Sequence, residues 1–211
     1  MKKTLMALSF ALILLSFFLY GALHSLLASH RVKRWACRAG GSLAQRWYRL
    51  AYNLVGAVTF LPVLALTALL PDRPLYAFPG LLRWAGYALQ GVALLLFAAA
   101  LLQTDLGAFS GLAQLRGQDD SLCSPDARGR GGSLVTGGLY RWVRHPLYTS
   151  GLLFLWANPT VSWNGLAFNL GATAYLVIGA LFEERKLLAE FGPAYAEYRR
   201  RTPMLIPLPR R

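Results

Sequence analysis

Long stretches without a charged side chain alternate with short basic segments along this chain of 211 residues. Three stretches contain no Asp, Glu, Lys or Arg, namely residues 4–29, 50–71 and 84–104. Each can cross a bilayer as a helix, because about 20 residues at a rise of about 1.5 Å per residue span the hydrocarbon core. A fourth such stretch, residues 146–182, is too long for one straight span.

The fourth stretch has a natural break in its middle. Pro159 cannot donate a backbone hydrogen bond and biases Asn158 away from helical geometry, so we expect a tight helical hairpin there. The predicted fold is all-α, a polytopic membrane protein with five transmembrane helices. It forms a single domain over residues 1–211, with spans at about 4–29, 50–71, 84–104, 146–158 and 162–182, a cytoplasmic loop over 105–145 and a cytoplasmic, helical C-terminal tail over 183–211.

The basic residues predict the orientation. With five crossings, 18 of the 22 Lys and Arg side chains fall on one side of the membrane, which the positive-inside rule places in the cytoplasm. The N-terminus is then outside and the C-terminus cytoplasmic. Lys2 and Lys3 favour a competing interpretation of the first span as a signal peptide, but its apolar run exceeds the length of a signal core and no clear Ala-x-Ala site follows.

The composition indicates which class of protein this is. Hydrophobic residues make up 55% of the chain and charged residues only 15%, which excludes disorder, while the formal net charge is +13. A basic chain is often a nucleic-acid binder, but one that is also this apolar is more typical of a membrane. Cys37 and Cys123 stand alone in the sequence, which indicates neither a disulfide framework nor a zinc site.

Candidate chemistry gathers at the ends of the predicted hairpin. Arg144 and His145 come just before Pro146, which suits the first turn of a helix, and the N–H groups of a helix N-terminus favour an anionic ligand group. The last span ends at Glu183 and Glu184. Because a hairpin returns to the side it entered from, we expect His145 and the two carboxylates to be neighbours.

Structural explanations remain open for each of these residues. Glu183 can pair with Lys186 on one helix face, Arg144 can anchor the span, and His145 can cap the helix. His24, inside the first span, is either a functional intramembrane residue or a packing one. The long polar segment over residues 105–144 is either a mobile lid or a connector.

Several segments resemble the integral-membrane methyltransferases, a group that includes isoprenylcysteine carboxyl methyltransferase, phospholipid methyltransferases and the bacterial methanethiol S-methyltransferases with the NnrU proteins. The similarity is carried by YRWVRHPLY at residues 140–148 and EERKLLAEFGPAYAEYRRRTPMLIP at residues 183–207. LHSLLAS at 23–29, FSGLAQL at 109–115 and LFLWANPT at 153–160 resemble the methanethiol group in particular.

The resemblance implies an enzyme of a bacterial inner membrane that uses S-adenosylmethionine as methyl donor. It implies that Glu183 and Glu184 bind the ammonium group or the ribose hydroxyls, and that Arg201 binds the carboxylate. Residues implied to line the remaining cofactor pocket are Tyr140, His145, Pro146 and Tyr148. Arg144 and His145 are the candidate catalytic residues, since a thiol acceptor reacts as the thiolate, which a positive field stabilises.

The implied acceptor is a small or lipophilic molecule at the lipid membrane, either a thiol or an isoprenylcysteine-type carboxylate, with no nucleic acid and no metal. No Gly-x-Gly-x-x-Gly follows a predicted strand, which excludes a soluble Rossmann methyltransferase. Two alternatives remain. One is a membrane reductase of the sterol-reductase type that uses NADPH, and the other is a non-enzymatic NnrU-like accessory protein.

Overall fold

The computed structural model describes residues 2–117, 123 and 134–208. Within that part of the chain, four helices are long and apolar enough to cross a membrane. They are α1 (Lys2–Ala28), α2 (His30–Leu69), α3 (Gly80–Leu102) and α7 (Trp163–Phe191). The chain is therefore an integral-membrane protein that is mainly helical, as the pattern of apolar stretches predicts.

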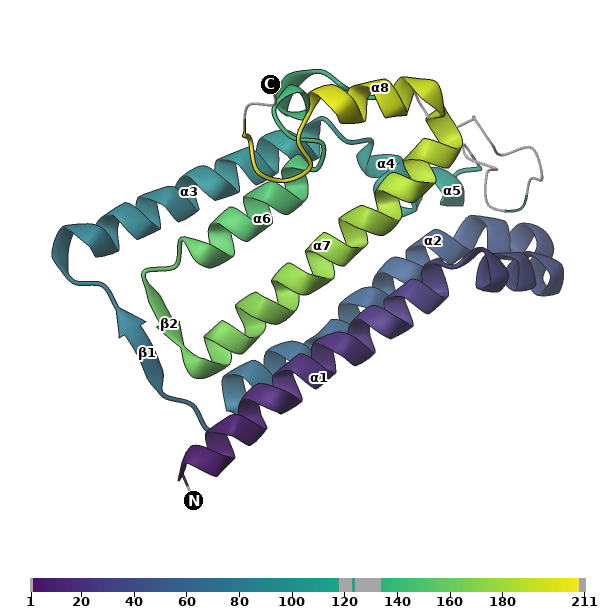
Figure 1. Cartoon of the computed structure of the whole chain (residues 1–211). Helices are drawn as coiled ribbons and strands as arrows, with labels where there is room; N and C mark the ends of the chain where they lie inside the picture. The colour runs from purple at the N-terminus through teal and green to yellow at the C-terminus, as the bar shows by residue number, and fades with distance from the viewer. Residues whose placement is uncertain (1, 118–122, 124–133, 209–211) are drawn as a thin grey trace.

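Helices α1, α2 and α7 lie side by side and form the main core (Figure 1). Ile13 and Phe17 from α1 meet Val63 from α2, and the small side chains of Ala167 and Ala172 on α7 let the helices approach closely. The ring of Phe17 packs edge to face against Phe168, with 5.2 Å between ring centroids. Because lipid is as apolar as Leu, such close packing rather than the hydrophobic effect holds membrane helices together.

One intramembrane polar contact fastens α1 to α2. The hydroxyl of Tyr52 is hydrogen-bonded to Nε2 of His24, and the His24 ring lies against Gly56, where a side chain would meet it at 3.2 Å. This contact agrees with the packing role of His24.

Helix α6 (Pro146–Trp156) packs along α3 and has only 11 residues, about 16 Å of helix. Its final carbonyl groups have partners outside the helix. The side-chain amides of Gln90 and Asn169 donate to the carbonyls of Phe154 and Leu155, at 3.0 and 3.2 Å. The last carbonyls of a helix have no partner within the helix, and these two amides supply one for each.

A two-stranded antiparallel sheet follows α6, where the sequence predicts only a hairpin turn. It pairs β1 (Pro74–Ala77) with β2 (Thr160–Ser162), and Ala77 lies opposite Thr160. Beside it, the buried side chain of Asn164 donates to the carbonyls of Thr67 and Leu70, at 3.3 and 3.1 Å. Asn164 thereby joins the end of α2 to the start of α7.

Helix α2 begins 20 residues before the span expected at residues 50–71, so the basic segment in front of that span is helical rather than a loop. It is bent at Gly41, whose φ of 48° and ψ of −126° are not helical. Before this bend Cys37 forms a disulfide with Cys123, across 86 residues of sequence, whereas their isolation in the sequence indicates no disulfide. Only the tertiary structure brings the two thiols together.

The segment after α3 contains short helices. They are α4 (Leu106–Ser110), α5 (Leu112–Leu115) and the 3₁₀ helix η1 (Gly138–Arg141). The amide of Asn53 on α2 donates to the carbonyls of Phe109 and Ser110, at 3.0 and 2.9 Å, which fixes α4 against α2. Most of residues 116–136, the central part of the expected lid or connector over residues 105–144, lies outside the described residues.

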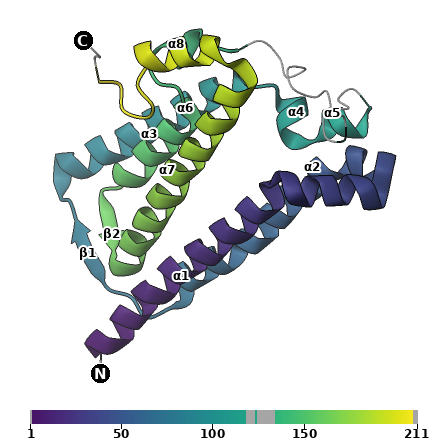
Figure 2. The ribbon, with the colours of Figure 1, turned by 45° about the vertical axis from the view of Figure 1, so that its right-hand side comes forward.

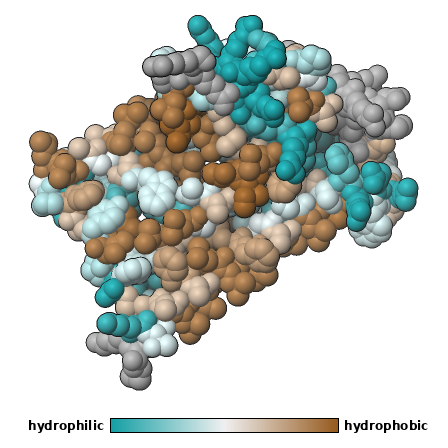
Figure 3. Space-filling view, viewed as in Figure 1, coloured by the Kyte–Doolittle hydropathy of each residue, from teal (hydrophilic) through white to brown (hydrophobic). Residues whose placement is uncertain are grey.

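The last helix, α8 (Pro193–Arg201), lies across the ends of α6 and α7, at the end of the molecule opposite the small sheet (Figure 1). The rotated view separates the α1–α2 pair from the group of α3, α6 and α7 (Figure 2). Hydrophobic residues cover the middle of the molecule, and hydrophilic ones gather over α8 and the neighbouring end of α7 (Figure 3). Polar chemistry is therefore concentrated at the α8 end.

The contact between Gly171 and Phe17 supports a stability prediction. A methyl group on Gly171 would overlap the ring of Phe17, whereas one on Gly179, also in α7, would meet nothing within 4 Å. We expect Gly171→Ala to lower the free energy of unfolding by about 1–3 kcal/mol, the usual cost of overpacking. Thermal unfolding in detergent checks this, with Gly179→Ala as the control. An equal melting temperature for the two variants would contradict the close contact between Gly171 and the ring of Phe17.

Candidate functional site

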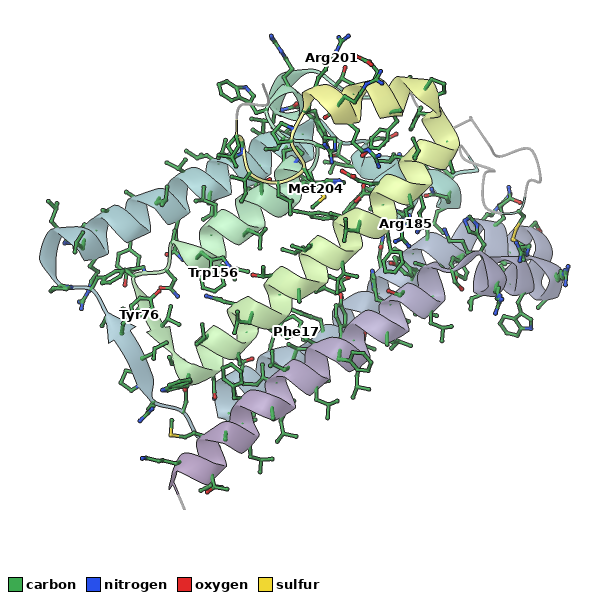
Figure 4. The ribbon with its side chains drawn as sticks, in the orientation of Figure 1. Phe17, Tyr76, Trp156, Arg185, Arg201 and Met204 are labelled. Atoms are coloured by element: carbon green, nitrogen blue, oxygen red, sulfur yellow. A yellow bond between two sulfur atoms is a disulfide. The ribbon has the colours of Figure 1, made fainter. Side chains whose placement is uncertain are left out.

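Charged side chains from two segments meet the backbone that follows α8. Arg144 and His145 stand directly before α6, Glu183 and Glu184 lie toward the end of α7, and Thr202 follows α8. Figure 4 labels Met204 at this place, between the upper ends of α6 and α7. We call the group of Arg144, His145, Tyr148, Glu183 and Glu184 the charged cluster.

The innermost part of the charged cluster is an ion pair. Nε of Arg144 donates to Oε1 of Glu184 at 2.6 Å, and Nη2 contacts the same oxygen. Nη1 of Arg144 donates to the backbone carbonyls of Arg199, at 3.1 Å, and Thr202. Both side chains are buried, and all three guanidinium nitrogens of Arg144 have partners within the protein.

The chain after α8 pairs with the segment that begins α6. The amide of Arg144 donates to the carbonyl of Pro203 at 2.9 Å, and the amide of His145 donates to that of Met204 at 3.2 Å. The hydroxyl of Thr149 donates to the carbonyl of Leu205 at 2.7 Å. Residues 203–205 therefore form one wall of the site. They do so through backbone carbonyls, which the pattern of reactive side chains in the sequence does not indicate.

The ring of His145 lies between the two carboxylates. Its Nδ1 is 3.6 Å from Oε2 of Glu183, and its Nε2 is 3.4 Å from Oε1 of Glu184, both long for hydrogen bonds. Nε2 is buried and has no hydrogen-bond partner among the described residues. Burial lowers the pKa of His145 below its ordinary value of 6.5, although both carboxylates act in the opposite direction.

The two adjacent glutamates have different surroundings. The side chain of Glu184 is 8% exposed and bound to Arg144, whereas that of Glu183 is 46% exposed. Oε2 of Glu183 accepts a hydrogen bond from the hydroxyl of Tyr148 at 2.9 Å, and the Tyr148 ring stacks on His145 with 5.4 Å between centroids. Glu183 is thus the carboxylate of the pair that can reach a ligand.

Other residues singled out in the sequence lie at varying distances from this centre. Pro146 is the first residue of α6, directly beside His145. The backbone carbonyl of Tyr140 accepts a hydrogen bond from the hydroxyl of Tyr198 at 2.6 Å, which joins η1 to α8. Arg201 lies apart, since its side chain is 78% exposed (Figure 4) and its Nε binds Oε1 of Glu197 at 2.6 Å.

Sequence reasoning missed Tyr195. It is the buried residue of α8, and its hydroxyl has no hydrogen-bond partner among the described residues. Burial raises the pKa of Tyr195 to about 12, so the phenol is protonated at neutral pH. Its position between Pro193 and the basic end of α8 offers no periodic signal, and only the folding of α8 onto the cluster shows it.

In the described part of the chain, no group of His, Cys, Asp and Glu side chains could hold a metal ion.

Apolar membrane helices with a buried charged cluster at one end are features of an integral-membrane enzyme. The family described as "NnrU protein" matches residues 11–204, and the chain belongs to this family. None of the solved structures matches the chain.

Curated relatives carry methyltransferase names. Methanethiol S-methyltransferase 2 of Bradyrhizobium diazoefficiens is 33% identical over 193 residues, 90% of this chain and 70% of that protein. The methanethiol S-methyltransferase of Mycobacterium tuberculosis is 47% identical over 73 residues, 35% of this chain and 30% of that protein. The protein-S-isoprenylcysteine O-methyltransferase of Schizosaccharomyces pombe is 35% identical over 97 residues, 44% of this chain and 40% of that protein. With the four apolar helices, these names support a membrane methyltransferase.

The unequal surroundings of the two glutamates predict unequal effects on stability. Glu184→Gln leaves the guanidinium of Arg144 buried without its counter-charge, which costs about 3–5 kcal/mol of unfolding free energy. Glu183→Gln removes a half-exposed carboxylate, and we expect a loss below about 1 kcal/mol. Thermal melting of the two variants in one detergent makes the comparison. Equal losses would disprove the division of roles between these neighbours.

The surroundings of His145 predict a pH effect on stability. Because its pKa in the folded protein is lowered from 6.5, the unfolded chain binds a proton that the folded chain does not. Stability should therefore fall as the pH drops below about 6.5 and be constant above it. Melting temperatures across this range measure the slope, and His145→Gln should flatten it. An unchanged slope in that variant would assign the effect to another group.

Proposed function

We propose that this protein transfers the methyl group of S-adenosylmethionine to a small thiol at the membrane face that carries α8. The single observation that carries the proposal is the half-exposed carboxylate of Glu183. It lies beside His145 and Tyr148, which can also hydrogen-bond a ligand. The other carboxylate of the site, that of Glu184, is already neutralised by Arg144. The family and the names of its relatives support the reaction class.

The charges of the cluster fit the cationic part of this donor. S-adenosylmethionine carries an ammonium group and a sulfonium, and an anionic, accessible side chain is the natural partner for either. Glu183 has that property, whereas Glu184 is closed off by Arg144. We therefore assign the contact with the ammonium group or the ribose hydroxyls to Glu183, with Tyr148 holding the carboxylate in place.

Two unpaired polar atoms support binding of a hydrogen-bonding ligand nearby. Nε2 of His145 and the hydroxyl of Tyr195 are buried beside the Arg144–Glu184 ion pair and make no hydrogen bond of normal geometry within the described residues, and such groups are rare in folded proteins. Both are placed to bind the adenosine or methionine part of the donor, together with Tyr140 and Pro146. Arg201 can bind the donor's carboxylate only after it releases Glu197.

Arg144 acts as a positioning residue in this proposal. Its guanidinium holds the carbonyls of Arg199 and Thr202 and thereby keeps the end of α8 over the cluster. Its positive charge, partly offset by Glu184, does not touch the reacting atoms.

The bound donor supplies a methyl carbon activated by the positive sulfur. The protein has to align a thiolate with that carbon and exclude water, and no covalent intermediate with the enzyme is needed. Alignment alone lowers the barrier by about 7–11 kcal/mol. The acceptor sulfur forms the new bond to carbon, the donor's carbon–sulfur bond breaks with its electrons on sulfur, and the thiol proton leaves. We assign this proton to His145, which is neutral near pH 7 because burial lowers its pKa.

The proposed topology has five crossings with the N-terminus outside and α8 in the cytoplasm of a bacterium, so that the cofactor enters the site from the cytoplasm. In this topology α6 and the residues up to β2 make the fourth crossing. The hydrogen bonds from Gln90 and Asn169 support it, because they satisfy the last carbonyls of α6 without water. The end of α7 from Glu183 onward and α8 form the cytoplasmic tail.

A binding experiment tests the proposal on the purified protein in detergent. We expect Glu183→Gln to weaken binding of S-adenosylmethionine about 10- to 100-fold, the usual value of a hydrogen bond to a charged group, without loss of the fold. Glu190→Gln, an exposed glutamate seven residues further along α7, is the matched control and should bind like the wild type. Calorimetry measures both, and absence of wild-type binding would end the proposal.

The acceptor is tested with the same preparations. Methanethiol with S-adenosylmethionine should yield dimethyl sulfide in the headspace, and Glu183→Gln should reduce the rate as it reduces binding. If the wild type instead methylates an S-isoprenylcysteine carboxylate and leaves methanethiol unchanged, the thiol assignment is wrong while the donor assignment stands.

A further inference from the structure

The first turns of α2 form a separate arm of the molecule. The non-helical Gly41 interrupts the helix, and in Figure 2 the residues before it turn away from the line of α1. This arm, residues 30–40, lies next to the end of α1 and carries only basic charges, since α2 contains no Asp or Glu from His30 to Leu69. It is a projecting basic helix at the end of the apolar bundle.

Four exposed side chains of the arm fall on a single face. Arg31, Arg34, Trp35 and Arg38 are spaced i, i+3, i+4 and i+7, and all four are exposed. Cys37, which binds Cys123, points about 100° away from this face. In the described part of the chain, no ion pair uses these arginines. We call this set the arginine face.

Aromatic residues accompany the arginines. The side chain of Trp35 is 69% exposed in the middle of the arginine face, and after the bend Arg46 and Trp47 are again exposed neighbours. Trp is enriched at the depth of lipid headgroups, where its ring is partly apolar and its N–H is solvated. Arginine binds phosphate oxygens with two parallel hydrogen bonds. The combination fits a phospholipid surface, which offers both environments within one headgroup layer.

We propose that the arginine face binds the phosphate groups of anionic phospholipids in the leaflet next to the α8 end of the protein. The position of the arm at the end of the apolar helices places it at headgroup depth, and the exposed Trp35 favours a lipid over a soluble acidic partner. The lipid site is separate from the charged cluster and does not depend on the methyl-transfer proposal.

Binding of phosphatidylglycerol and phosphatidylcholine to the full-length protein, measured by native mass spectrometry from detergent, tests the inference. Arg34→Gln combined with Arg38→Gln should weaken phosphatidylglycerol binding at least about tenfold, since each cation near an anionic surface contributes to binding. Lys2→Gln combined with Lys3→Gln removes the same charge at the other end of α1 and should leave binding unchanged. Both variants alter only termini or exposed positions, and circular dichroism checks the fold.

A second comparison separates lipid from an acidic protein. Trp35→Ala keeps every cation, and we expect it to weaken association with phosphatidylglycerol nanodiscs severalfold while leaving binding of oligo-glutamate unchanged. The proposal is overturned if phosphatidylglycerol binds no better than phosphatidylcholine, if the two charge variants behave alike, or if oligo-glutamate binds the arginine face more tightly than the lipid.

Discussion

The buried ion pair between Arg144 and Glu184 is the constraint on which the α8 end of the molecule depends. A guanidinium removed from water must have its charge and its N–H groups satisfied, and Glu184 with the carbonyls of Arg199 and Thr202 does both. The pair joins the start of α6, the end of α7 and the end of α8. Backbone hydrogen bonds from Arg144 and His145 to residues 203 and 204 also join two of these segments, and the ion pair adds the end of α7 to them.

The same pair makes two adjacent glutamates different. Neighbouring positions on a helix diverge by about 100°, so Glu184 faces inward to Arg144 while Glu183 faces Tyr148 and remains half exposed. One carboxylate stabilises the site, and the other is available to a ligand. His145 lies between them, where burial keeps it neutral and leaves one ring nitrogen without a partner. The proposed methyl transfer rests on this division.

Helix ends impose a second requirement, because their last carbonyl groups need partners that the helix itself does not supply. Helix α6 is short and would expose its last carbonyls, but Gln90 and Asn169 bind them, and Asn164 does the same for the end of α2. These amides lie far from the charged cluster and look unremarkable in the sequence. They nevertheless decide where α6 can end and how the region after it returns to α7.

The amino-acid sequence alone predicts the apolar helices, the break near Pro159 and the grouping of Arg144 and His145 with Glu183 and Glu184, because span length and chain reversal are local properties. Three features became visible only in the folded chain: which glutamate is buried, the ion pair of Arg201 with Glu197, and the burial of Tyr195 on the inner side of α8. The tertiary structure also joined Cys37 to Cys123 and continued α2 back to His30. These outcomes depend on contacts between segments far apart in the chain, which no local pattern encodes.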